Sequence, residues 1–108
     1  MKDMFGCRSL LKEINLSNFN TNKVKNMSCM FSNCSSLKEL NLSKFNTNKV
    51  NDMRFMLYHC SSLKELNISI FKFKDSTNMI WMFANFCTNL SLIYKDELIK
   101  KKYKKLFN

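Results

Sequence analysis

Five cysteines and one histidine are the residues of this chain best suited by type to bind a metal or to act as nucleophiles. No two cysteines form a C-x-x-C pair, and the close pair Cys29 and Cys34 has no matching second pair. Because a structural zinc site needs paired ligands at such spacings, the sequence argues against one. The cysteines are Cys7, Cys29, Cys34, Cys60 and Cys87.

The single histidine, His59, stands next to Cys60, a combination that could form a nucleophilic Cys–His pair. Such a pair requires both side chains to face one pocket and a third group to orient the imidazole. Adjacent residues of a coil point in different directions, and the sequence offers no orienting group. We therefore predict that the protein is not an enzyme and has no catalytic residue, metal or cofactor. His59 is expected to be an exposed residue at the end of a helix.

A repeat of 26 residues organises the chain that must position these side chains. It is marked by Met4-Phe5, Met30-Phe31 and Met56-Leu57, with a degraded fourth copy at Met82-Phe83. A period of 20–50 residues is typical of proteins built from stacked repeats. Each coil then buries its apolar side chains against the next coil, so a short chain can still form a continuous core.

One coil, residues 37–62, contains the elements that every repeat predicts. Leucines alternate with polar residues over Leu37–Leu42, which is the period-two pattern of a short strand. Over Val50–Leu57, apolar residues recur at i, i+3 and i+7, the stripe of a helix of about ten residues. Thr47 or Asn48 is suited to cap the start of that helix.

The predicted fold class is α/β, a leucine-rich-repeat solenoid of period 26. Parallel strands line one face, short helices line the other, and a helix caps the C-terminal end. Strands are expected over residues 11–16, 37–42 and 63–68, and a fourth around residues 90–94. Residues 1–94 form the repeat array in this prediction.

The residues from Met30 to Met53 carry a resemblance to a known family. They read Met-Phe-x-x-Cys-Ser-Ser-Leu-Lys-Glu-Leu-Asn-Leu-Ser-x-Phe-Asn-Thr-x-x-Val-x-x-Met, and the spacing Leu-x-x-Leu-x-Leu is the leucine-rich-repeat pattern. This string resembles the BspA-like leucine-rich-repeat surface proteins over residues 4 to about 94. The resemblance implies a bacterial or protist repeat protein, commonly part of a larger surface-exposed chain with adhesive or host-interaction roles. It carries over no catalytic residues.

The repeat also bears on the cysteines, because Cys34 and Cys60 occupy the same position in successive copies. In stacked coils they would lie about 5 Å apart, which is within the range that disulfides span. The alternative is a column of buried thiols that act as small apolar core residues. We favour the buried thiols.

Three columns of polar residues are expected on the strand-lined face, which is the usual ligand-binding surface of a curved solenoid. In the alternative interpretation they are scaffold: the asparagines hydrogen-bond along their own ladder, and neighbouring lysines offset the repulsion between glutamates. The columns hardly vary from copy to copy, which favours the scaffold. They are nevertheless our candidate partner-binding residues: Glu13, Asn15, Ser17, Glu39, Asn41, Ser43, Glu65, Asn67 and Ser69.

The net charge of +10 has two explanations. A basic protein often binds nucleic acid or an anionic membrane. A genome rich in A and T would also supply Lys, Asn, Ile and Phe together and deplete Ala, Gly and Pro, which is the profile of this chain. We favour the compositional explanation.

The chain has one glycine and no proline, although a loop-rich fold needs many turns. Asparagines cluster where turns are required, and Asn tolerates the left-handed backbone region better than most residues. We expect asparagines to take the place of glycine and proline at the turns: Asn18, Asn20, Asn22, Asn46 and Asn48.

Residues 95–108 are predicted to form a basic amphipathic capping helix. Asp96 and Glu97 suit its N-terminus and lysines its later turns. The competing interpretation is a helix that binds anionic lipid or nucleic acid. We favour the cap, since every solenoid end needs one. The basic residues concerned are Lys100, Lys101, Lys102, Lys104 and Lys105.

These observations predict a non-enzymatic repeat scaffold that binds a protein partner or a host surface. The alternatives are electrostatic binding through the basic tail, or a fragment of a longer surface repeat protein with no independent role. The uncapped N-terminal coil predicts self-association as a further contact, whereas nucleic acid and membrane are not expected partners. The resemblance implies the cell surface or secretion. Met1-Lys2-Asp3 begins no signal peptide, which predicts the cytoplasm if this chain is the full product.

Overall fold

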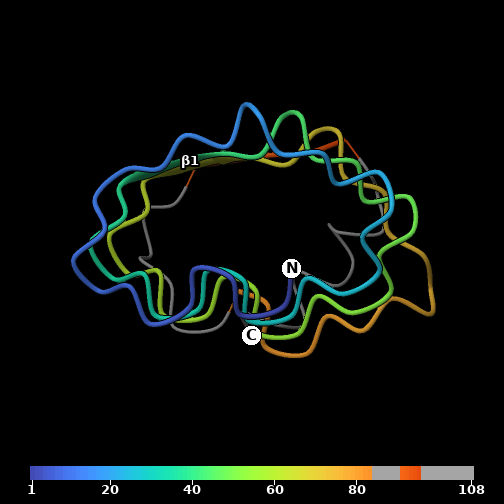
Figure 1. Ribbon diagram of the computed structural model, residues 1–108, viewed down its shortest axis with the longest axis horizontal. Coiled ribbons are helices and arrows are strands. Elements are labelled where there is room, and N and C mark those ends of the chain that lie inside the picture. Colours follow the sequence, from blue (N-terminus) through green and yellow to red (C-terminus); the bar gives the residue numbers. More distant parts are fainter. Residues whose placement is uncertain (84–90, 96–108) are drawn as a thin grey trace.

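The computed structural model describes residues 1–83 and 91–95. Over these residues the chain winds into stacked coils, and successive coils follow nearly the same outline when viewed along the short axis (Figure 1). Residues 26 apart in the sequence lie opposite one another in neighbouring coils. The period of the sequence is therefore the length of one coil.

Three short strands lie side by side on one face of the stack: β1 Glu39–Asn41, β2 Glu65–Asn67 and β3 Ser91–Ile93. They form one parallel sheet in the order β1-β2-β3. Leu40 and Leu66 at the strand centres are buried. The parallel strands predicted within residues 37–42, 63–68 and 90–94 are confirmed, each shorter than the pattern suggested.

The strand predicted over residues 11–16 does not form. The first coil begins at Met4 and the second at Met30. An open hollow of about 300 Å³ lies between this part of the first coil and the second coil, and it is lined in part by Ile14 and Asn41. The first coil carries exposed Arg8 at the repeat position of buried Cys34. Because a guanidinium cannot enter an apolar column without a large desolvation cost, this coil packs less closely.

No helix occurs among the described residues, so the predicted α/β solenoid with helices on its second face is wrong. The segment that follows Asn26 shows why. The Met30 N–H donates to the Met27 carbonyl at 3.3 Å within its coil, whereas the Phe31 N–H donates to the Met56 carbonyl of the next coil at 2.9 Å. An α-helix would direct all of these N–H groups to its own carbonyls. Here they alternate between a tight turn and the neighbouring coil.

The apolar spacing that predicted a helix is produced by this run of turns. Successive hydrogen bonds link residues three apart, as from Met56 to Met53 and from Cys60 to Leu57. Apolar residues therefore reach the core every three or four positions, as they would on a helix. Val50, Met53 and Leu57 are indeed buried. The inward stripe was correctly identified, but the backbone conformation was not.

The turns place non-glycine residues in the left-handed region, with φ between 56° and 64°. None of the asparagines expected at the turns is among them. Asn20 and Asn46 instead accept hydrogen bonds through Oδ1 from the N–H groups of Asn22 and Asn48, at 3.0 and 2.9 Å. Such Asx turns shape the backbone without glycine or proline. The left-handed residues are Asp3, Cys7, Cys29, Asn33, Phe55, His59 and Trp81.

Buried threonines connect neighbouring coils. The Thr47 hydroxyl accepts the N–H of Lys72 at 2.9 Å and donates to the Lys72 carbonyl at 3.3 Å. Thr21 makes the same two bonds to Asn46. The predicted helix cap at Thr47 is therefore wrong, because its hydroxyl satisfies backbone groups of the next coil.

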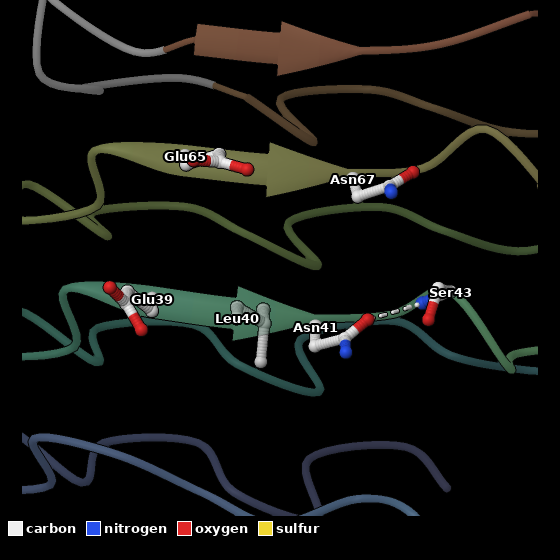
Figure 2. Close-up of a pocket in the computed structure, with 6 residues that line it drawn as sticks. All are labelled: Glu39, Leu40, Asn41, Ser43, Glu65 and Asn67. Carbon is white, nitrogen blue, oxygen red and sulfur yellow. Dashed lines mark hydrogen bonds between the residues drawn. The ribbon is translucent and has the colours of Figure 1, made fainter.

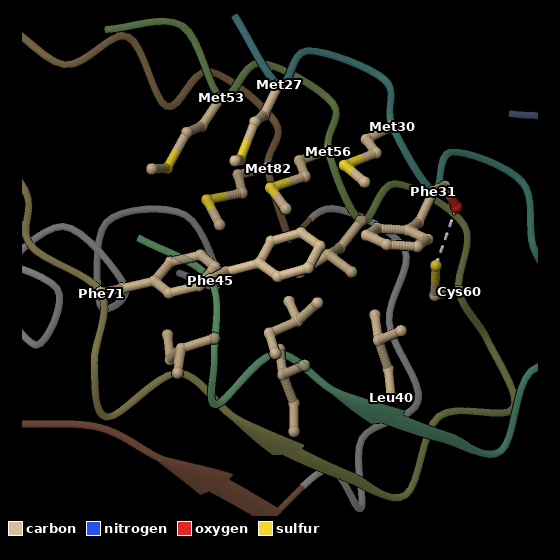
Figure 3. Packing of buried hydrophobic residues seen from close by; sticks show 14 of the residues in the cluster. Met27, Met30, Phe31, Leu40, Phe45, Met53, Met56, Cys60, Phe71 and Met82 are labelled. Atoms are coloured by element: carbon tan, nitrogen blue, oxygen red, sulfur yellow. Dashed lines mark hydrogen bonds between the residues drawn. The ribbon is translucent and has the colours of Figure 1, made fainter. Parts of the chain in front are cut away.

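The core consists of stacked columns of large apolar side chains between the strands and the run of turns (Figure 3). Methionines such as Met27 and Met53 reach inward from the turns, and Phe45 and Phe71 fill the space beside them. In the first coil the equivalent Phe19 is only half-buried, whereas Phe45 is 1% exposed. The burial that holds the array together thus increases from the first coil to the second.

Two parts of the prediction concern residues outside the described ranges. The capping helix over residues 95–108 lies there apart from Lys95. The five tail lysines, Lys100, Lys101, Lys102, Lys104 and Lys105, lie there as well.

Candidate functional site

The strand face carries an open hollow of about 310 Å³. Glu39, Asn41 and Ser43 line it from one coil, and Glu65 and Asn67 from the next (Figure 2). Five of the nine residues predicted for partner binding therefore meet at one place. The parallel sheet brings them together, because it sets equivalent residues of two coils opposite each other.

The glutamates form the acidic end of this hollow. Glu39 lies opposite Glu65 in the β1–β2 register, and both side chains are exposed. Neighbouring strands are about 4.8 Å apart, so the two carboxylates repel each other weakly across water. A cationic group placed between them would relieve this repulsion and bind to both.

The asparagines form the amide end. Asn41 Oδ1 accepts the N–H of Ser43 at 3.0 Å (Figure 2). Asn67 Oδ1 accepts the N–H of Ser69 at the same distance. The scaffold interpretation expected these asparagines to hydrogen-bond to one another along the column, and they do not. Because the oxygen is held by the turn, the Nδ2 groups of Asn41 and Asn67 remain available as donors on the surface.

The remaining predicted strand-face residues lie outside the hollow. Asn15 and Ser17 line the neighbouring hollow of about 300 Å³, and Glu13 is exposed on the same coil without lining either one. Ser69 lines a third hollow of about 750 Å³ that also includes Lys72 and Lys95. The nine residues are therefore distributed over three hollows and one exposed position.

The chemistry available on the strand face is recognition through hydrogen bonds and charge. Across residues 1–83 and 91–95, no three His, Cys, Asp or Glu side chains are grouped so as to hold a metal ion. The same residues contain no helix long and apolar enough to cross a membrane.

The two cysteines of the repeat column are free and completely buried. Cys60 Sγ donates to the Phe31 carbonyl at 3.2 Å (Figure 3). Cys34 Sγ donates to the Phe5 carbonyl at the same distance. Burial raises the pKa of the Cys60 thiol to about 12 and also raises the pKa of Cys34. Both are therefore protonated at neutral pH and are poor nucleophiles. The interpretation of a buried thiol column is confirmed.

His59 and Cys60 do not form a pair. His59 is half-buried at the surface, edge-on to the Tyr58 ring at a centroid distance of 4.2 Å, while the Cys60 thiol lies in the core. The expectation that adjacent residues point in different directions is confirmed at this position. His59 ends a turn rather than a helix.

A cluster of surface aromatic rings was missed by reasoning from the repeat. Phe55, Tyr58 and Trp81 lie with ring centroids 5.5 to 5.9 Å apart. The detectable signal was the position shared by Cys29, Phe55 and Trp81, at which the side chain becomes large and aromatic in later copies.

Comparison with known proteins gives a family. Residues 1–95 match the family described as "Mycoplasma protein of unknown function, DUF285". The chain belongs to the DUF285 family. No curated protein and no solved structure matches it. The residues of both the strand-face hollow and the aromatic cluster lie within the DUF285 match.

Proposed function

We propose that this DUF285 protein is a non-enzymatic repeat scaffold that binds a protein partner through its strand face. The single observation that carries the proposal is the hollow in which Glu39 and Glu65 lie in register beside Asn41 and Asn67. None of these four side chains fills the core. They are exposed or half-buried polar groups held at fixed spacing by the sheet.

The chemistry of the hollow indicates the kind of partner segment that fits. Paired carboxylates favour a lysine or arginine side chain. Amide donors at the other end suit backbone carbonyls of an extended peptide, whose alternating groups match a strand-like surface. We therefore propose a basic, extended segment of a partner protein as the ligand.

The resemblance to BspA-like surface proteins supports the same class of function, since their roles are adhesive or involve host interaction. The charge of the whole chain does not favour it, because a protein of net charge +10 repels basic partners at long range. We expect the affinity to depend on the local glutamates and to increase at moderate salt, which screens the long-range repulsion.

A peptide-display library tests the proposal without a known partner. The folded protein is immobilised, enriched peptides are sequenced, and each is synthesised and titrated against variants. We expect enriched peptides to be rich in Lys or Arg. The double variant Glu39→Gln/Glu65→Gln should weaken their binding at least tenfold, by the loss of two charge-assisted bonds.

Two further variants sharpen the interpretation. Glu13→Gln is the matched control, since it removes the same charge from an exposed position outside the hollow. Asn41→Asp/Asn67→Asp retains the oxygens that hold the turns but removes the amide donors, and it should weaken binding even though it adds negative charge. Enriched peptides that bind the Glu39→Gln/Glu65→Gln variant as tightly as the wild type would refute the strand-face proposal.

A further inference from the structure

The aromatic patch lies on the opposite side of the core from the strands. We define it as the three rings in mutual contact, Phe55, Tyr58 and Trp81. Figure 3 shows Met53 and Met56, which flank Phe55 in sequence, entering the core from the side away from the sheet. Trp81 is 51% exposed, and Phe55 and Tyr58 are half-buried. The patch is therefore a separate surface from the strand-face hollow.

The rings form one continuous surface across two coils. Phe55 and Trp81 hold the same repeat position in successive coils, with ring centroids 5.9 Å apart. Tyr58 lies 5.5 Å from Phe55 and 5.9 Å from Trp81 and completes a triangle. Aromatic groups in such contact give a broad apolar surface that is costly to leave in water.

The fold does not require aromatic residues at these positions. The same turns form in earlier coils around Asp3 and Cys29, where φ is 58° and 57°. Phe55 and Trp81 take almost the same values, 56° and 58°. This backbone region suits Asn, Asp or Gly and is unfavourable for bulky side chains. Phe55 and Trp81 are thus strained as well as accessible, a combination that occurs at functional positions.

Electrostatics select the chemistry of the occupant. Arg54, which precedes Phe55, has a side chain that is 47% exposed. Its guanidinium holds Asp52 through Nε–Oδ1 at 3.0 Å and Nη2–Oδ2 at 2.8 Å, which neutralises that carboxylate. The chain as a whole has a net charge of +10. The Arg54–Asp52 pair has no net charge, so the excess of positive charge over the whole molecule is what favours an acidic partner segment over a basic one.

We propose that the aromatic patch is a docking surface for an acidic segment of a partner protein that carries an aromatic or large aliphatic anchor residue. The anchor packs against Phe55, Tyr58 and Trp81, and the net positive charge of the protein favours acidic residues beside it. Trp, Tyr and Arg are the residue types that dominate binding energy at protein interfaces. The inference does not rest on the strand-face proposal, because it uses different residues and a partner segment of opposite charge.

The single tryptophan of the chain supplies the probe. Trp81 fluorescence is titrated with a synthetic peptide that has one Phe between two pairs of Glu residues. Two matched peptides replace either the Glu residues by Lys or the Phe by Ala, and a single-stranded thymidine oligonucleotide tests base stacking. We expect a saturable change with the acidic Phe peptide and affinities at least tenfold lower for the other three ligands.

Variants distinguish a docking role from a structural one. Phe55→Asn places a residue suited to the left-handed backbone, so it should weaken the acidic peptide at least tenfold while the thermal midpoint stays equal or rises. Arg54→Gln should weaken binding and reduce its dependence on salt. Glu39→Gln/Glu65→Gln should leave patch binding unchanged, which separates this test from that of the strand face.

Three results would overturn the proposal. One is equal response to the acidic and the Lys peptides. The second is tighter binding of the oligonucleotide than of the acidic peptide, which would assign the patch to nucleic acid. The third is a Phe55→Asn variant that unfolds at lower temperature and binds the peptide as well as the wild type does, which would make Phe55 a structural residue.

Discussion

Burial divides three of the cysteines into two chemical groups. Cys34 and Cys60 are fully buried and donate to backbone carbonyls, whereas Cys7 is exposed. The repeat allowed the buried pair to be predicted, because a small apolar residue that recurs at one position of a stacked array packs into the core. The exposed Cys7 stands one residue early in its copy, which was the indication that it does not join the column.

Thiol labelling should follow this division. With a coloured disulfide reagent at neutral pH, we expect Cys7 to react within minutes and Cys34 and Cys60 only when the protein unfolds. Mass spectrometry of the labelled peptides identifies each site. Rapid labelling of Cys60 in the folded protein would contradict the burial of this column.

Alkaline pH should destabilise the protein through Cys60. The folded thiol holds its proton up to a pKa of about 12, whereas the unfolded thiol loses it near 9.0. The stabilisation is therefore fully present below pH 9 and is lost as the pH rises toward 12, by up to about 4 kcal/mol. Urea unfolding at pH 8 and pH 11, compared with a Cys60→Ala variant, measures it. We expect the difference in the free energy of unfolding between the wild type and the variant to be smaller at pH 11 than at pH 8. An equal difference at the two pH values would exclude this mechanism.

At the scale of the element, strands and turns differed in how well the sequence predicted them. The alternation around Leu40 and Leu66 is specific to an extended backbone, so these strands were located correctly. A spacing of three to four residues is shared by helices and by runs of turns. A helix differs from a run of turns in which carbonyl accepts each backbone N–H. Here the N–H groups alternate between carbonyls of their own turn and carbonyls of the neighbouring coil, and no local sequence pattern encodes that second partner.

The strand-face site was predictable in its residue types but not in its limits. The Glu and Asn columns were recognised from the repeat, and the structure unites members of two coils in one hollow. The first coil was expected to contribute Glu13 in the same way. It does not, because Arg8 interrupts the buried column that would hold this coil against the second.

Thr47 provides a test of how the coils are connected. Thr47→Val retains the shape of the side chain but leaves the Lys72 N–H and carbonyl without their partner. We expect a loss of about 1–3 kcal/mol in the free energy of unfolding. Thr47→Ser keeps the hydroxyl and should lose less. Equal losses in the two variants would show that the methyl group, rather than the hydrogen bonds, is what matters.

At the scale of the whole molecule, one stack of coils supports two surfaces of different chemistry. The strand face presents acids and amides. The opposite side of the stack, which is formed by the run of turns, presents aromatic rings with an arginine next to them in the sequence. Both depend on the same alignment of neighbouring coils, since each surface is assembled from residues 26 apart. In a repeat array this alignment arises from contacts between nearest neighbours. Anything that separates the second and third coils should therefore disrupt both surfaces together.

The most direct test of the account is the destination of the Phe31 N–H. Scalar couplings across hydrogen bonds, measured by NMR on the isotopically labelled protein, identify the carbonyl that accepts each amide proton. We predict a coupling from the Phe31 nitrogen to the Met56 carbonyl carbon of the next coil. A coupling from Phe31 to the Met27 carbonyl, the i→i−4 bond of an α-helix, would contradict the stacked-turn fold and the two surfaces built on it.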